Sequence, residues 1–143
     1  MATRNASAQW NGTLQEGNGT MALGSGAYEG PYTYKSRFED GPGTNPEELL
    51  GAAHAGCFSM ALGLALTEAG TPADTISTQA RVHLRQHEGL PTITQIDIVT
   101  RGRVPGIDDA AFKEAAEQAK TGCIVSRALA GVGEITLDAA LES

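Results

Sequence analysis

The two cysteines of this chain are the residues whose positions suggest chemistry. Cys57 lies in "NPEELLGAAHAGCFSMALGLAL" and Cys123 in "DDAAFKEAAEQAKTGCIVSRAL", two segments whose apolar residues recur at helical spacing. A free cysteine often packs as a small apolar side chain, so burial in the core is the simplest interpretation. Because each thiol falls on the apolar face of its segment, the two could also meet in the interior as a disulfide or a working redox pair.

Three histidines raise the alternative of a metal site. His54 lies three residues before Cys57 on the same face of the expected helix, while His83 and His87 lie in or beside an expected strand. A structural zinc ion takes four protein ligands and a catalytic one three, often from closely spaced pairs such as CxxC. The chain contains no CxxC pair, which disfavours a metal, and we expect none.

Catalysis by a nucleophilic thiol is a further interpretation, and it has two forms. In a cysteine hydrolase, His54 would activate Cys57, but Cys123 would have no function. In a thiol peroxidase, one thiolate attacks the O–O bond of a peroxide and becomes a sulfenic acid, which a second thiol converts to a disulfide. Such a thiolate needs a nearby cation, and Arg37 in "KSRFED" is the candidate. The residue types alone leave these alternatives open.

Length and charge restrict the class of protein. The chain has 143 residues, enough to bury a core without covalent support, and we expect a single domain over residues 1–143. Its formal net charge of -7, with no cluster of lysine and arginine, disfavours binding to nucleic acid or to an anionic membrane. Residues 1–20 lack the apolar core of a signal peptide, and we expect no segment long enough to span a bilayer. We therefore expect a cytoplasmic protein, whose thiols are kept reduced.

The N-terminal third is expected to form strands. Apolar and polar residues alternate around Trp10 and again around Ala22, with a turn near residues 16–19, which predicts a hairpin. The segment "GPYTYKSRFED" is expected to be extended and to end in the loop "DGPGTN". A long helix should begin after the capping residue Asn45 and stop at Gly70.

The remainder of the chain continues with strands, a helix and a strand. A strand–turn–strand unit is expected over residues 76–104, with its turn at "HEGLP", and a closing strand over residues 133–143. Between them, residues 105–129 have the pattern of a second helix, with an aspartate near its start and a break near Gly122. This order predicts an α+β fold in which helices pack on a largely antiparallel sheet.

Three segments together carry a family resemblance. The run "RFEDGPGTNPEELLGAAHAGCFSMALGLALTEAG", with "AKTGCIVSRAL" and the closing "EITLDAAL", resembles the OsmC/Ohr family of organic hydroperoxide reductases. The wording "GTNPEELLGAAHAGCFSMAL" is closer to the OsmC branch than to the Ohr branch. The likeness covers nearly the whole chain, in order and with matching spacing. It implies largely antiparallel sheets packed around two central helices, in an intertwined homodimer of α+β subunits with active sites at the interface.

The resemblance also implies a role for four residues. Cys57 maps onto the family's peroxidatic nucleophile and Cys123 onto its resolving thiol, which together form a disulfide during the reaction. Arg37 maps onto an arginine that contacts the reactive thiolate, and Glu47 onto a glutamate that holds this arginine by a salt bridge. The implied reaction reduces an organic hydroperoxide to an alcohol without metal, haem or flavin. An external dithiol, of lipoyl type in the Ohr branch, then restores the thiols.

Two features of this sequence refine that implication. The family commonly has proline after the second cysteine, whereas Ile124 stands here, so Cys123 can be presented differently. Glu47 and Cys57 are ten residues apart, which is about 15 Å along a straight helix. If Glu47 serves the site of Cys57, either the helix is broken or the glutamate comes from another subunit. Our hypothesis is that Arg37 and Glu47 of one subunit complete the site around the two cysteines of the other.

Several expectations concern the surroundings of this site. His54 is expected to be a packed or hydrogen-bonded core residue and not a catalyst. Apolar side chains are expected to line a pocket that favours bulky peroxides, namely Phe38, Phe58, Met60 and Ile124. The alternative from another class is a non-catalytic stress or ligand-binding protein with the same fold.

Overall fold

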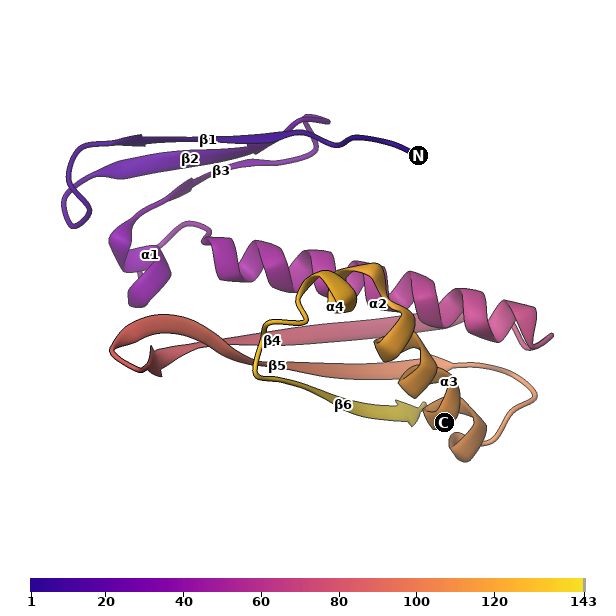
Figure 1. Cartoon of the computed structure of the whole chain (residues 1–143). Helices are drawn as coiled ribbons and strands as arrows, with labels where there is room; N and C mark the ends of the chain where they lie inside the picture. Colours follow the sequence, from indigo (N-terminus) through magenta and orange to yellow (C-terminus); the bar gives the residue numbers. More distant parts are fainter. Residues whose placement is uncertain (143) are drawn as a thin grey trace. The chain divides into compact units, whose positions relative to one another are not determined.

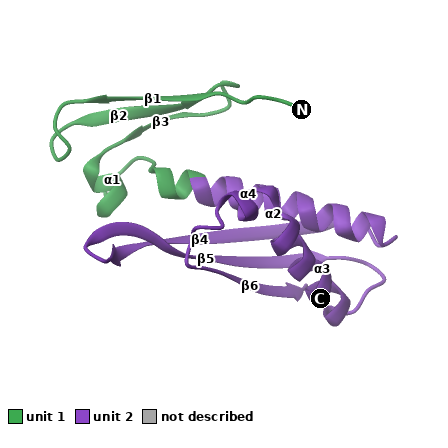
Figure 2. Cartoon of the chain, viewed as in Figure 1, with its two compact units in different colours: residues 1–49 green, residues 50–143 purple. Residues whose placement is uncertain are grey.

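A computed structural model describes residues 1–142 of the chain. Strands and helices follow one another in the order β1-β2-β3-α1-α2-β4-β5-α3-α4-β6, which gives an α+β protein with two three-stranded sheets (Figure 1). The chain divides into two compact units, residues 1–49 and residues 50–143 (Figure 2). The single domain expected over the whole chain stays a prediction.

The first unit contains an antiparallel sheet of three strands. β1 (Ala6–Asn11) pairs with β2 (Asn18–Leu23), and β2 pairs with β3 (Glu29–Tyr32). The predicted hairpin is thereby confirmed.

An aromatic pair spans this sheet across a glycine. Trp10 on β1 and Tyr32 on β3 both lie opposite Gly19 on β2, and their ring centroids are 5.2 Å apart. A Cβ atom at Gly19 would lie 2.7 Å from the Trp10 ring and 2.6 Å from the Tyr32 ring. Glycine at this position therefore lets the two rings meet over the middle strand.

α1 (Tyr34–Phe38) follows β3 within the segment expected to be extended. That expectation is confirmed for residues 30–32, which belong to β3, and is wrong for residues 34–38. Thr33 begins the helix, because its hydroxyl accepts the N–H of Ser36 at 3.1 Å while the Ser36 hydroxyl accepts the N–H of Thr33 at 2.8 Å. This reciprocal capping box stabilises a helix too short to show an apolar period in the sequence. It places Arg37 on a helix and not on a loop.

α2 (Pro46–Glu68) is the long helix that the sequence predicts. The N–H of Glu48 donates to Asn45 Oδ1 at 2.7 Å, which confirms Asn45 as the capping residue. The helix ends just before Gly70, whose φ of +82° is readily adopted by glycine. It runs from Pro46 to Glu68 without a break.

α2 is also long and apolar enough to cross a membrane, judged by length and composition alone. The expectation that no segment reaches this length is therefore wrong. The core helix of a soluble protein meets the same criteria. One face of α2 is buried, and Met60 and Leu64 on another face are 79% and 59% exposed.

The second unit is built on a long hairpin and one added strand. β4 (Thr75–His87) and β5 (Leu90–Arg103) pair antiparallel around a turn at Glu88 and Gly89, both with positive φ. β6 (Glu134–Leu141) pairs with β5 in parallel, so this ladder departs from the otherwise antiparallel arrangement. The reason is that two helices return the chain to the same end of the sheet before β6 begins.

Those two helices are α3 (Asp109–Gly122) and α4 (Ile124–Ala128). Asp108 caps α3, since its Oδ1 accepts the N–H of Ala111 at 2.8 Å. The break expected near Gly122 falls at Cys123, which ends α3 and begins α4. Cys123 therefore lies in a corner between two helices.

The core of the second unit lies between one face of this sheet and the helices α2 and α3. Gly102 on β5 allows the fully buried Phe112 of α3 to approach, because a Cβ at Gly102 would lie 2.4 Å from the Phe112 ring. On the same sheet face, Thr78 links Thr100 to Ser59 of α2 through hydroxyl contacts of 2.9 and 2.8 Å. The buried apolar residues are Phe58, Leu62, Leu66, Ile96, Ile98, Val104, Phe112, Ala116, Ala119, Cys123 and Ala139.

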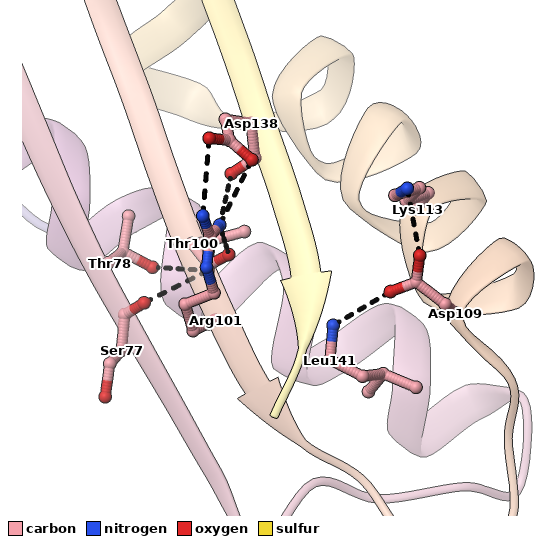
Figure 3. A network of polar contacts seen from close by, with 8 residues as sticks. All are labelled: Ser77, Thr78, Thr100, Arg101, Asp109, Lys113, Asp138 and Leu141. Carbon is pink, nitrogen blue, oxygen red and sulfur yellow. Dashed lines mark hydrogen bonds and ion pairs between the residues drawn. The ribbon is translucent and has the colours of Figure 1, made fainter. Parts of the chain in front are cut away.

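Polar contacts fasten β6 to its neighbours (Figure 3). Asp109 at the start of α3 accepts the N–H of Leu141 at 3.0 Å and pairs with Lys113 at 2.9 Å. Arg101 on β5 pairs with Asp138 on β6 at 3.2 Å. The parallel strand is thus held by side chains as well as by its ladder.

Candidate active site

The second unit brings the two cysteines together. Cys57 lies in the middle of α2 and is half-buried, while Cys123 lies at the α3–α4 corner and is 1% exposed. Both thiols are free, and they lie close enough for each to shift the pKa of the other. Adjacent free thiols meet the first requirement of a pair that cycles between dithiol and disulfide.

The start of α4 presents backbone N–H groups to both sulfurs. The Cys123 sulfur accepts the N–H of Ser126 at 3.5 Å, and the N–H of Val125 also faces it. The N–H groups of Val125 and Ile124 face the Cys57 sulfur. A proline in place of Ile124 would have no N–H, so isoleucine adds a donor to the pocket of Cys57.

These surroundings affect the two thiols in opposite directions. Burial raises the pKa of the Cys57 thiol, and the neighbouring Cys123 raises it further. Burial also acts to raise the pKa of Cys123. Hydrogen bonds from the Ser126 N–H, the Cys57 thiol and the Ser126 hydroxyl outweigh it, so the pKa of Cys123 lies below its ordinary value. Within this unit, Cys123 is therefore the thiol of the pair that ionises more readily.

His54 is fully buried and contacts the cysteine corner through a serine. Its Nε2 lies 2.7 Å from the Ser126 hydroxyl, and its Nδ1 has no partner among the described residues. Burial lowers the pKa of His54, so the imidazole is neutral. The expectation of a hydrogen-bonded core histidine is confirmed. Because its hydrogen bond goes to Ser126, His54 is not the base that a hydrolase based on Cys57 would require.

The first unit brings Arg37 and Glu47 together. Glu47 Oε1 accepts a hydrogen bond from Arg37 Nε at 3.0 Å and forms an ion pair with Arg37 Nη2 at 2.9 Å. The Glu47 side chain is 9% exposed and that of Arg37 41%. The other carboxylate oxygen, Oε2, is buried without a partner among residues 1–142. The carboxylate therefore fixes one edge of the guanidinium and leaves other N–H groups of Arg37 free for a ligand.

Backbone and side-chain contacts fix the positions of α1 and the start of α2. The Ser36 hydroxyl donates to the carbonyl of Thr44 at 2.7 Å, and Asn45 Nδ2 donates to the carbonyl of Ser36 at 3.0 Å. These bonds join the helix that carries Arg37 to the cap of the helix that carries Glu47. The ion pair is thus part of a preorganised corner.

Arg37 lines an aromatic pocket of about 420 Å³ in the first unit. Its guanidinium lies 5.4 Å from the centroid of the Phe38 ring, which also lines this pocket, and the expected role of Phe38 in a peroxide pocket stays a prediction. Phe58, also expected to line a pocket, is instead fully buried in the core of the second unit. The pocket walls are Trp10, Gly12, Leu14, Tyr32, Thr33, Tyr34, Arg37 and Phe38.

Metal-ligating side chains do not gather in the described part of the chain. Within residues 1–142, no group of three or more His, Cys, Asp or Glu side chains could hold an ion. His83, one of the sequence candidates, pairs with Asp97 at 2.6 Å on the second sheet.

The four residues singled out in the sequence form two pairs, Cys57 with Cys123 and Arg37 with Glu47, and each pair belongs to one unit. Sequence reasoning missed Ser126, which contacts both Cys123 and His54. The signal for it was present. A break at Cys123 makes that residue the cap of a new helix, and a cap residue faces the N–H three positions later.

Comparison with known proteins places the chain in a family. The family model described as OsmC-like protein matches residues 39–138. The protein named Peroxiredoxin OsmC of Escherichia coli strain K12 is 47% identical over 137 residues, covering 95% of this chain and 94% of that protein.

Solved structures share the fold. An organic hydroperoxide resistance protein from Elizabethkingia anophelis superposes with a TM-score of 0.80 at 24% identity, covering 99% of this chain and 98% of that one. The organic hydroperoxide resistance protein OhrB of Bacillus subtilis gives a TM-score of 0.73 at 23% identity, covering 96% and 98%. With the family model matching most of its length, this chain belongs to the family of OsmC-like proteins.

Proposed function

We propose that this protein is a thiol-dependent peroxidase that reduces organic hydroperoxides to alcohols. The observation that carries the proposal is the contact between two free thiols, Cys57 and Cys123, beneath the N–H groups of α4. The similarity to a protein named Peroxiredoxin OsmC supports it. A non-catalytic stress or ligand-binding protein is not favoured, because it would have no use for adjacent thiols whose pKa values are shifted in opposite directions.

The reaction follows from the two sulfurs. The Cys57 thiolate attacks one oxygen of ROOH, the O–O bond breaks, and RO⁻ takes up a proton and leaves as ROH. Cys57 is thereby oxidised to a sulfenic acid. Cys123 attacks the Cys57 sulfur, the S–O bond breaks, and the hydroxide leaves with a proton as water. A dithiol then reduces the Cys57–Cys123 disulfide by exchange.

Arg37 is the proposed activator of Cys57. Since burial raises the pKa of Cys57, the first step needs a cation beside that sulfur. A guanidinium there would favour the thiolate and stabilise the charge on the leaving oxygen. Glu47 would hold Arg37 in place through its hydrogen bond to Nε and its ion pair with Nη2.

We propose that Arg37 and Glu47 act on the cysteines of a second subunit. One of the two ways to bring Glu47 to Cys57 was a broken helix, and α2 has no break between these residues. A homodimer is supported by the exposed apolar side chains of α2, Met60 and Leu64, together with Ile124 at 73% exposure. Exposed apolar surface of this kind is typical of a protein–protein contact.

The aromatic pocket beside Arg37 supports an organic substrate. Its rings would bury the alkyl or aryl group of a hydroperoxide, whereas hydrogen peroxide would gain nothing from them. We propose a dithiol of lipoyl type as reductant and the cytoplasm as location, since the cycle requires reduced thiols. Replacing Trp10 by alanine should reduce the preference for cumene hydroperoxide over hydrogen peroxide.

The decisive experiment measures consumption of cumene hydroperoxide with dithiothreitol or dihydrolipoamide by wild type, Cys57→Ser and Cys123→Ser. Cys57→Ser should be inactive, and activity equal to wild type would refute the proposal. Cys123→Ser should still reduce one equivalent of peroxide but form no intramolecular disulfide. Mass spectrometry after one equivalent should show loss of two hydrogens in wild type only.

A further inference from the structure

The buried pair of His54 and Ser126 has no part in the mechanism derived so far. His54 Nε2 lies 2.7 Å from the Ser126 hydroxyl, and both residues are buried. Ser126 also donates its backbone N–H to the Cys123 sulfur at 3.5 Å, and its side chain is among the groups that lower the pKa of Cys123. A continuous line of contacts therefore runs from a buried histidine to the second cysteine.

The position of each proton in this line follows from counting donors and acceptors. His54 is neutral and carries one N–H, on either Nδ1 or Nε2. Nδ1 has no partner among the described residues whichever nitrogen carries the proton, so the contact with Ser126 makes the difference between the tautomers. A proton on Nε2 can be donated to the Ser126 oxygen, and this is the tautomer that we assign. The Ser126 hydroxyl is then free to donate to the Cys123 sulfur.

We propose that His54 and Ser126 form a one-way hydrogen-bond chain, Nε2–H to Oγ–H to Sγ, that holds Cys123 as the thiolate for the resolving step. This inference rests on the proposed peroxidase function and adds two residues to the site, Ser126 and His54. Ser126 touches a reacting atom and acts as a catalytic residue. His54 acts through Ser126 and is a positioning residue.

The chain contributes to the second step of the reaction. After the first step, Cys57 carries a hydroxyl and no charge, so no thiolate at Cys57 opposes the ionisation of Cys123. The Cys123 thiolate then attacks the Cys57 sulfur, the S–S bond forms, the S–O bond breaks, and the departing hydroxide takes a proton from solvent. His54 and Ser126 keep their own protons throughout.

The groups that surround Cys123 leave the hydrogen-bond chain of His54 and Ser126 as the neutral donor specific to its sulfur. Cys57 on α2 is the titratable group in contact with the sulfur, and His54 faces it through Ser126. Lys120 on α3 donates to the carbonyl of Ile135, and Arg127 on α4 is exposed. Neither cation is among the contacts that lower the pKa of Cys123.

The first test needs no peroxide. In Cys57→Ser protein, Cys123 is the remaining thiol, and its ionisation is followed by the ultraviolet absorbance of the thiolate. Ser126→Val should move the titration midpoint upward, whereas Ser126→Thr, which has the same shape but keeps the hydroxyl, should not. His54→Leu should also raise the midpoint, and His54→Gln, which keeps a donor, should restore it.

The second test separates the two chemical steps in protein with both cysteines. After one equivalent of cumene hydroperoxide, rapid quenching and mass spectrometry give the rates of sulfenic acid and disulfide formation. Ser126→Val should lower the ratio of the second rate to the first by about tenfold or more, the effect of losing a hydrogen bond to a charged atom. Ser59→Ala is the matched control, because Ser59 is a helix serine bonded to Thr78 and not to sulfur.

The outcomes distinguish this inference from the function on which it rests. If Ser126→Val has the same midpoint of Cys123 ionisation and the same ratio of disulfide to sulfenic acid formation as Ser126→Thr, the proposed hydrogen-bond chain is wrong. The proposed peroxidase function would still stand. If wild type consumes no peroxide, the proposed function fails. The ultraviolet titration still decides whether the hydrogen-bond chain of His54 and Ser126 favours the ionisation of Cys123. Melting curves for each variant show whether the fold is retained, and the Thr/Val pair removes differences in shape.

Discussion

Replacing Glu47 by glutamine tests whether this first-turn glutamate acts through Arg37 or only through the dipole of α2. Its Oε1 accepts a hydrogen bond from Arg37 Nε at 3.0 Å and pairs with Nη2 at 2.9 Å, and its side chain is 9% exposed. Glutamine keeps the shape and one acceptor oxygen but removes the charge. The change therefore weakens a charge-assisted hydrogen bond and its ion pair without opening a cavity.

The expected magnitude follows from burial on each side of the pair. A hydrogen bond to a charged group contributes about 1.5–3 kcal/mol, whereas a fully exposed ion pair contributes about 0–1 kcal/mol. Because the Arg37 side chain is 41% exposed, solvent screens the pair, and Glu47→Gln should lower the free energy of unfolding by about 1–2 kcal/mol. For a chain of this size the melting temperature should fall by about 3–8 °C. A loosened guanidinium should also reduce kcat/KM for cumene hydroperoxide by about tenfold or more.

Glu48→Gln is the matched control for this change. Glu48 lies in the same helical turn and has a similar dipole contribution of about 0.3–1 kcal/mol, but its carboxylate accepts the Thr44 hydroxyl at 2.8 Å and not an arginine. Calorimetry and steady-state kinetics on both variants separate the two effects. Equal losses in the two variants would refute the reasoning, because the ion pair would then add nothing beyond the helix dipole.

Three further changes test other parts of the structure. Gly102→Ala should lower the free energy of unfolding by about 1–3 kcal/mol in chemical denaturation, because its Cβ would lie 2.4 Å from the buried Phe112 ring, whereas Gly122→Ala, with open space around it, should not. Hydrogen bonds from Gln95, His83 and Thr136 hold the pKa of Asp97 far below its usual range, so its contribution to stability is present above about pH 4 and is lost as the pH falls further. Melting temperatures measured down that range should fall less steeply in Asp97→Asn than in wild type or Asp138→Asn. Met60→Glu should shift the protein toward monomer in analytical ultracentrifugation, and Leu90→Glu, at a similarly exposed apolar position at the start of β5, should not.

The parts of the fold that the sequence predicts are those with a local signal. Asn45 and Pro46 predict the start of α2, and the alternation of apolar and polar residues in β4 and β5 predicts their hairpin. α1 could not be predicted from periodicity, because five residues do not complete two helical turns and its capping box uses Thr33 and Ser36 in place of the usual glutamate. The parallel pairing of β6 is likewise a property of the path of the chain between strands and not of β6 itself.

The site shows the same division between local and long-range information. Each cysteine could be placed on an apolar helix face from spacing alone, and Glu47 could be placed in a first helical turn. The contact of His54 with Ser126 joins residues 72 positions apart, so no local pattern announces it. The pKa values of the two thiols shift in opposite directions partly because of backbone N–H groups of α4. These groups face the sulfurs only because α3 ends at Cys123.

The charge balance of the thiol pair argues that the two chemical steps need two different activators. Attack on peroxide requires the thiolate on Cys57, whereas attack on the sulfenic acid requires it on Cys123. The second unit favours the charge on Cys123, through α4 and Ser126. A cation brought to Cys57 is then what the first step lacks, and Arg37, held by Glu47, is the proposed source. It follows that Arg37→Gln should slow sulfenic acid formation and spare the later disulfide step, while Ser126→Val should do the reverse, and a variant that slowed both steps equally would contradict this division.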